Sequence, residues 1–273
     1  MSLQFQARKA IHIGRQHLIN FTNCQDACFL YQGEFDEQPL IIGIICDGCS
    51  EGEASEVGAR LASEFLIREA LHLFQKSVPV EVIPGVLYST LVEFLRNQVH
   101  AGHAFFNSQD QVNFIKNNLL FTVVGIIATP SKCVVFITGD GTIVINDEVI
   151  IVDANNTPSY PAYHLVDRSK LNTNASELPT SFDIYDIDME TIGRVAIGSD
   201  AWHHEQDLLE EQIWGFKNSA GLQRKINVWS KSEKRFSDDV SIITVELIRP
   251  TVESELTAID TEQQNEVTDA SNS

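Results

Sequence analysis

The chain has 273 residues, a hydrophobic fraction of 43% and a formal net charge of −19. This length can form one large domain or two small ones, with enough apolar side chains for a substantial core. A surface of this charge repels nucleic acid phosphates and anionic lipid, so we expect neither nucleic acid nor membrane as a partner.

The apolar segments and the cysteines indicate the compartment. The longest apolar runs, Leu40–Cys46 and Leu119–Ala128, are far shorter than the roughly 18 to 20 residues of a membrane-spanning helix. Residues 1–14 contain no continuous apolar run of the kind found in a secretory signal. Five cysteines, an odd number, fit a reducing compartment better than a disulfide framework. We therefore expect a cytoplasmic protein.

The first third of the chain predicts two strands and then a helix. Asp26–Gln32 is one expected strand, and the continuous apolar run Pro39–Cys46 is typical of a strand buried on both faces. Ser50 and Glu53 have the spacing of a capping box. This spacing predicts a helix that begins after Ser50 and ends at about Phe74.

The middle of the chain continues with a second helix, from about Val82 to Val99, and then returns to strands. Turn residues at Pro130-Ser131 and Asp147-Glu148 each separate two apolar segments, which predicts two β-hairpins. The expected strands of these hairpins are Leu119–Thr129 with Lys132–Thr138, and Thr142–Asn146 with Val149–Val152.

The last third is more polar. Asn155–Ser181 contains prolines, so we expect a loop with one short strand near Tyr163–Val166. The last expected elements are two strands, Arg194–Gly198 and Val240–Leu247, separated by helical segments at Glu205–Gln212 and Ala220–Trp229. Because hairpins dominate this order, the sequence predicts antiparallel sheets in an α+β layered fold.

The end of the chain is acidic. After Arg249 there is no Lys or Arg, whereas six Asp or Glu residues occur among Thr, Ser, Gln and Asn. Such a composition is typical of a solvated, disordered segment. We therefore expect a folded domain over residues 1–250, followed by an acidic disordered tail over residues 251–273.

Four aspartates share one setting, at the start or end of an expected strand and next to a small or polar residue: Asp47, Asp140, Asp200 and Asp238. Several strand ends at one rim of a sheet would gather their carboxylates. Clustered carboxylates repel one another and favour a bound cation, and their hard oxygen ligands suit Mg²⁺ or Mn²⁺. The alternative is that Asp and Gly only mark turns after strands. Four such positions in this order favour the metal site.

Five short motifs follow one another between about residue 10 and residue 247. They are GRQH with NCQDA (14–17 and 23–27), DGCSEGEASEVGA (47–59), GDG (139–141), GSDAW (198–202) and DDVS (238–241). In this order the motifs resemble those of the metal-dependent protein phosphatases of type 2C, and the pattern is closer to the bacterial branch of that family.

The resemblance implies a fold and an activity. The fold is two antiparallel β-sheets packed face to face, flanked by α-helices on both outer faces. The activity is that of a metal-dependent phosphoserine/phosphothreonine protein phosphatase with two Mn²⁺ or Mg²⁺ ions and a weaker third. Such an enzyme hydrolyses the phosphate ester by direct attack of a water that bridges the ions. The implied substrate is a phosphorylated protein, and we expect a monomer.

The resemblance also assigns roles by position. Asp47 would bridge both ions, and Asp200 and Asp238 would complete the ligands of the first ion. These three aspartates are the expected catalytic residues. The other ligands implied are the Gly48 carbonyl at one ion, Asp26 through ion-bound water and Asp140 at the third ion.

Three residues inside the motifs depart from the family pattern, and one of them is Gln25, which replaces an acidic residue. Ala201 stands where the motif has Gly, so the turn after Asp200 must avoid positive φ. Cys49 stands where many members have His as a proposed proton donor.

The absence of the usual phosphate-binding arginine before the acidic element is a further departure. Phe21 lies at that point. Arg15 or His17 is the candidate phosphate ligand in its place, and the alternative is that each is an ordinary surface residue. The departures support a second hypothesis, in which a catalytically weak or inactive phosphatase-fold protein binds a phosphoprotein or signalling partner.

The cysteines allow a third hypothesis. Cys24-x3-Cys28 and Cys46-x2-Cys49 superficially resemble a four-thiolate zinc site. However, Cys46 ends one apolar strand and Cys28 lies within another, where small buried thiols are common. The pattern therefore favours structural thiols.

Overall fold

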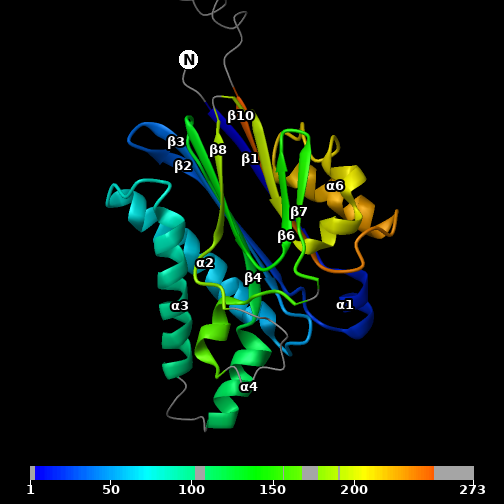
Figure 1. Cartoon of the computed structure of the whole chain (residues 1–273). Helices are drawn as coiled ribbons and strands as arrows, with labels where there is room; N and C mark the ends of the chain where they lie inside the picture. Colours follow the sequence, from blue (N-terminus) through cyan, green and yellow to red (C-terminus); the bar gives the residue numbers. More distant parts are fainter. Residues whose placement is uncertain (1–3, 102–107, 156, 168–177, 190, 249–273) are drawn as a thin grey trace, which may run out of the picture.

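The computed structural model describes residues 4–101, 108–155, 157–167, 178–189 and 191–248 (Figure 1). One sheet contains β1 (Gln4–His12), β6 (Gly141–Ile145), β7 (Glu148–Val152), β9 (Arg194–Gly198) and β10 (Val240–Ile248). The second sheet contains β2 (Asp26–Phe35), β3 (Gln38–Gly48), β4 (Phe121–Ala128), β5 (Lys132–Thr138) and β8 (Asp183–Asp188). All neighbours are antiparallel, in the orders β1-β10-β9-β6-β7 and β2-β3-β4-β5-β8.

Helices cover the outer face of each sheet (Figure 1). The second sheet is covered by α2 (Ser55–Gln75), α3 (Ile83–Ala101), α4 (Ser108–Asn118) and the 3₁₀ helix η1 (Pro161–Leu165). The first sheet is covered by η3 (Asp200–His204), α5 (Gln206–Leu209) and α6 (Ser219–Lys231), while α1 (Arg15–Asn20) follows β1. This arrangement confirms the predicted α+β sandwich with helices on both outer faces.

Strand alternation divides the interior into three apolar layers. On β3, Ile41 and Ile45 face the other sheet, whereas Ile42 and Ile44 pack on the side covered by α2. On β10, Ile243 faces the other sheet in the same way. Each such side chain, fully buried, stabilises the fold by about 1.5–3 kcal/mol. Two-sided burial explains why Pro39–Cys46 is apolar without alternation.

One rim of the sandwich collects strand ends from both sheets. In the second sheet Asp26 lies opposite Asp47, which lies opposite Thr122, at the start of β2, the end of β3 and the start of β4. In the first sheet Gly198 at the end of β9 lies opposite residues near the starts of β6 and β10. The two rims meet because Gly139 and Asp140 carry the chain from β5 directly into β6.

Two expectations from the sequence are wrong. The capping box at Ser50 does not form, because α2 begins at Ser55 with Ala54 at its N-cap position. The preceding residues are held instead by a hydrogen bond from Ala54 N to Asn117 O of 2.9 Å. The short strand expected near Tyr163–Val166 is the 3₁₀ helix η1, whose buried Tyr163 packs on Tyr160.

The sequence does not predict the 3₁₀ helix η3, nor β1, α1, α4 and β8. β1 contains a buried Arg8, whose partners include the distant Phe216 carbonyl and Glu246. α4 is mostly polar and buries only Val112 and Ile115 among its described side chains. These sequences carry a weak local pattern because distant residues complete their environment.

Parts of the predicted organisation fall outside the described residues. These parts are residues 168–177 of the expected loop and residues 251–273 of the expected acidic tail. The last described strand, β10, ends at Ile248, and a domain boundary near residue 250 stays a prediction. No helix within the described ranges is long and apolar enough to cross a membrane.

Candidate metal centre

The second sheet contributes Asp26 and Asp47 from directly opposed positions on its inner face. Asp26 is 6% exposed, and neither of its carboxylate oxygens has a hydrogen-bond partner. Asp47 is only partly buried and lines a cavity at the rim. Gly48 follows it in a crowded position, where a Cβ atom would lie 2.6 Å from Ser55 Oγ. Glycine at position 48 therefore permits the close approach of α2 to this strand end.

Asp140 is presented by a turn between two glycines. Gly139 has φ of 91° and Gly141 has φ of 154°, a region that favours glycine. A Cβ atom on Gly139 would also lie 2.6 Å from Thr122 Cγ2. The GDG motif is thus explained by backbone geometry, and it directs Asp140 from the link between the sheets to the rim.

Asp200 is fixed by contacts between η3 and β10. Ser199 N donates to Ser241 O at 3.1 Å, Ser241 N donates to Ser199 Oγ at 3.1 Å, and Trp202 Nε1 donates to Ser241 O at 3.0 Å. A Cβ atom on Gly198 would lie 2.6 Å from the Trp202 ring, which explains the first glycine of GSDAW. Ala201 lies within η3 and has no positive φ, as its side chain requires.

Asp238 and Asp239 precede β10, and α1 holds them in place. Asp239 is buried and accepts hydrogen bonds from Gly14 N at 2.6 Å and Gln25 N at 2.5 Å. His17 Nδ1 lies 2.8 Å from Asp239 Oδ2, and His17 Nε2 lies 3.7 Å from Asp238 Oδ1. Asp239 therefore anchors the turn, whereas the Asp238 side chain remains half exposed at the cavity.

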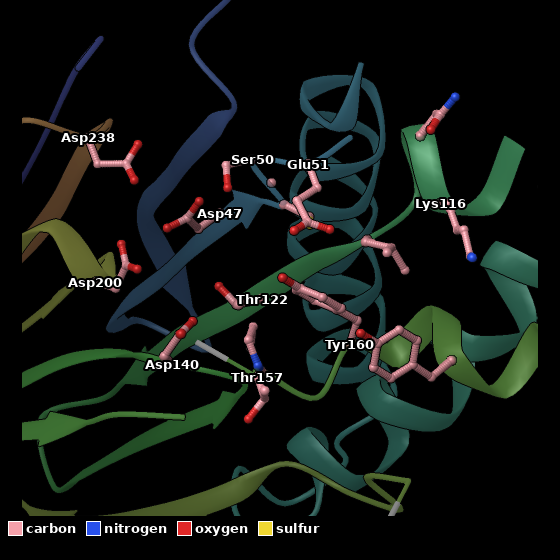
Figure 2. Close-up of a pocket in the computed structure, with 16 residues that line it drawn as sticks. Asp47, Ser50, Glu51, Lys116, Thr122, Asp140, Thr157, Tyr160, Asp200 and Asp238 are labelled. Carbon is pink, nitrogen blue, oxygen red and sulfur yellow. The ribbon is translucent and has the colours of Figure 1, made fainter. Parts of the chain in front are cut away.

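The four aspartates predicted from strand ends line one cavity of about 490 Å³ (Figure 2). Asp47 comes from the second sheet, Asp140 from the link, and Asp200 and Asp238 from the first sheet. A second cavity of about 680 Å³ shares Asp140, Asp200 and Asp238. The structure therefore brings all four together from both sheets, with Asp26 buried behind them.

Mutual repulsion and burial perturb these acids. Burial and the charge of Asp239 raise the pKa of Asp26 to about 7, and burial and Asp200 raise the pKa of Asp140 to about 6. Burial, Asp26 and Asp200 hold the pKa of Asp47 well above its usual range. The pKa of Asp238 is also raised, mainly by burial. A divalent cation would relieve this repulsion, and the all-oxygen donor set suits Mg²⁺ or Mn²⁺.

The tightest acidic group has another role. Among the described residues, the group of potential ligands that all lie within 4.8 Å of one another is His17, Asp238 and Asp239. Both oxygens of Asp239 already accept backbone hydrogen bonds, so this group is a structural anchor. The expected ligands are spread more widely around the cavity, and their assignment to ions stays a prediction.

The two expected phosphate ligands do not line either cavity. Arg15 is exposed on α1, and His17 is buried against Asp239. Phe21, at the position of the usual arginine, is 97% exposed and directs no cation to the site. Lys116 of α4 does line the cavity with the aspartates. The sequence does not predict this position, because α4 has too few apolar residues to be recognised as a helix that packs at the site.

The cysteines do not form the four-thiolate arrangement. Cys28 belongs to the apolar layer between the sheets, whereas Cys46 faces the helices on the other side of the same sheet. Both thiols are buried, and burial raises the pKa of Cys28 to about 12. Neutral thiols on opposite faces of one sheet cannot share a zinc ion.

Comparisons with known proteins agree on a class. A bacterial serine phosphatase superposes with a TM-score of 0.57 at 13% identity, covering 91% of this chain and 100% of that one. The serine/threonine phosphatase Stp1 from Staphylococcus aureus gives a TM-score of 0.55 at 14% identity, with 92% and 98% covered. RsbX, solved in complex with magnesium, gives 0.50 at 13% identity, with 89% and 96% covered. At these identities the likeness defines the fold.

The family of this chain follows from a comparison of its sequence with models of protein families. The model for protein phosphatase 2C matches residues 13–211. The chain belongs to the protein phosphatase 2C family, a metal-dependent class, which confirms the resemblance found in the five motifs. No curated protein matches the sequence.

Proposed function

We propose that this protein is a Mn²⁺- or Mg²⁺-dependent phosphoserine/phosphothreonine protein phosphatase. One observation carries the proposal: aspartates from both sheets line one cavity, and Asp26 behind them has a buried carboxylate without a partner. Family membership adds support, because it comes from a sequence model that spans most of the chain. The substrate would be a phosphorylated protein. The enzyme would act as a monomer in the cytoplasm.

Within this proposal, each acidic residue has a task set by its position. Asp47, Asp200 and Asp238 would bind two ions at the rim, together with the Gly48 carbonyl. Asp26 would accept a hydrogen bond from an ion-bound water, and Asp140 would hold a third ion. When bound, such ions lower the pKa of a water and neutralise charge on the phosphoryl oxygens.

The other cavity residues would bind the substrate without ionising. Tyr160 lies beside Cys49, and burial followed by the influence of that thiol raises its pKa far above neutrality. The Tyr160 hydroxyl therefore stays protonated and available as a hydrogen-bond donor. Thr122, opposite Asp47 in the sheet, presents a second neutral hydroxyl to the same cavity.

A weakly active or inactive phosphatase-fold protein that binds a phosphoprotein is the second candidate. The observation in its favour is Phe21, because an exposed aromatic side chain replaces the cation expected beside the site. The presence of every expected carboxylate at one rim supports the enzyme over this alternative.

Hydrolysis of an aryl phosphate by the purified protein tests the proposal. We expect turnover with Mn²⁺, none in chelator, and a kcat lower by several powers of ten in Asp47→Asn and Asp238→Asn, because each variant loses the charge of one ion ligand. Asp183→Asn, an exposed change on β8, is the matched control.

Calorimetric titration with Mn²⁺ gives a readout that does not depend on turnover. Wild-type protein should bind the ion, and Asp47→Asn should bind it at least tenfold more weakly. Full turnover in chelator would refute the metal mechanism. Mn²⁺ binding without any turnover would favour the weakly active alternative.

A further inference from the structure

The end of the aspartate cavity formed by α4 carries a cation that the proposed chemistry does not use. Lys116 lines the cavity together with Asp47 and Glu51, and every other charged residue in the described lining is acidic. No ion pair joins Lys116 to Glu51 or to another described residue. In a chain with a net charge of −19, an unpaired lysine in an acidic cavity is available to an external anion.

Lys116 is held where it lies by the packing of α4. Asn117 O accepts the hydrogen bond from Ala54 N, and Ile115 is buried at 2% exposure. A Cβ atom on Gly58 would lie 2.1 Å from Asn118 O, so the end of α4 abuts the backbone of α2. Residues on both sides of Lys116 are thus fixed, and the lysine is half-buried in the cavity wall.

The largely buried Tyr160 lies between Lys116 and the four aspartates. Figure 2 shows Asp47, Asp140, Asp200 and Asp238 at one side of the cavity, Lys116 at the other, and Tyr160 between them. The Tyr160 and Tyr163 rings pack edge to face with centroids 5.2 Å apart. A phosphorylated residue at the carboxylate side would extend its peptide over these rings towards Lys116.

We propose that Lys116 determines specificity by binding a second anionic group of the substrate, close to the scissile phosphoserine or phosphothreonine. This inference rests on the proposed phosphatase function. The second group is a carboxylate or a second phosphate, because both accept charge-assisted hydrogen bonds from an ammonium group. Without Lys116, the acidic cavity would repel such a substrate.

Matched phosphothreonine peptides test the inference. Three peptides carry, next to the phosphothreonine, a neutral residue, an Asp or Glu, or a phosphoserine. We expect wild-type kcat/KM to favour one of the two doubly anionic peptides over the neutral one by about tenfold, equivalent to about 1.4 kcal/mol. The preferred arm identifies the anion as carboxylate or phosphate.

Variants of Lys116 then test whether this residue causes the preference for the anionic peptide. Lys116→Gln should bring the ratio between anionic and neutral peptides to about one, and Lys116→Glu should favour a peptide with a flanking Lys. Lys76→Gln, an exposed change at the end of α2, should keep the wild-type ratio. Because each ratio is taken within one protein, a general loss of activity does not affect it.

The outcomes separate the two proposals. A wild-type enzyme without preference, or a Lys116→Gln variant that keeps it, would overturn the role of Lys116 while leaving the phosphatase proposal intact. If wild-type protein hydrolyses neither peptides nor aryl phosphate, the phosphatase proposal fails. Fluorescence anisotropy with the same peptides, labelled, then tests whether Lys116 binds the second anionic group. Weaker binding of the anionic peptide by Lys116→Gln than by wild type supports the anion site, and equal binding refutes it.

Discussion

Asp140 is the carboxylate whose electrostatic cost can be worked out from the structure. The residue is 9% exposed, and burial together with Asp200 raises its pKa from 3.8 to about 6. At 1.36 kcal/mol for each pKa unit, the ionised group destabilises the metal-free fold by about 3 kcal/mol. Asp140→Asn removes this charge, so the metal-free variant should be more stable than wild type at neutral pH.

The pH dependence of this effect has a definite sign. Well below pH 3.8 the aspartate is protonated in both folded and unfolded chains, and the two proteins should have similar stability. As pH rises through the window between 3.8 and about 6, only the unfolded chain loses its proton, so wild-type stability falls. The advantage of Asp140→Asn should therefore grow over this window and be complete above it.

Thermal unfolding in chelator measures the difference. For a domain of this size, about 3 kcal/mol corresponds to a Tm difference of roughly 6 to 12 °C, an upper limit because the Asn amide must find partners. Asp183→Asn is the control on an exposed strand. With saturating Mn²⁺ the advantage should shrink or reverse, since Asp140 is proposed to hold an ion. A Tm difference that is absent, or constant from pH 4 to pH 8, would refute the electrostatic reasoning.

Two further predictions concern a thiol and the end of the chain. Cys49→Ala should keep aryl phosphate hydrolysis within about tenfold, because the proposed mechanism gives Cys49 no proton-transfer role; a loss of roughly a thousandfold would make it catalytic. Deleting residues 251–273 should leave that rate and the Tm nearly unchanged, because the segment has no periodic apolar face to offset about 1 to 2 kcal/mol of ordering entropy per residue. A large drop in Tm would move the domain boundary.

The central strands and the aspartate rim could be predicted from the sequence because their determinants are local. Pro39–Cys46 is apolar on both faces, so its strand is evident without knowledge of its neighbours. Asp47 lies at the end of β3 and Asp140 lies just after β5, and the glycines around Asp140 meet a local backbone requirement. The motif order then suffices for the family and the sandwich.

Features that depend on distant contacts could not be predicted. Ser50 has the spacing of a helix cap, but Asn117, far along the chain, binds this segment and delays the helix to Ser55. The role of His17 follows from Asp239, which no local pattern links to it. Lys116 is a polar residue on a polar helix, and its position becomes evident only where α4 meets Gly58.

The position of β10 has a consequence for the order in which the protein can be made. β10 is the last described strand of the chain, yet it lies between β1 and β9, and β1 has no other strand partner in its sheet. A nascent chain that stops before Val240 therefore leaves its first strand unpaired and Asp238 without the strand that fixes it. The rim that gathers the carboxylates can close only after synthesis has passed Ile248, so a growing chain on the ribosome carries no assembled site.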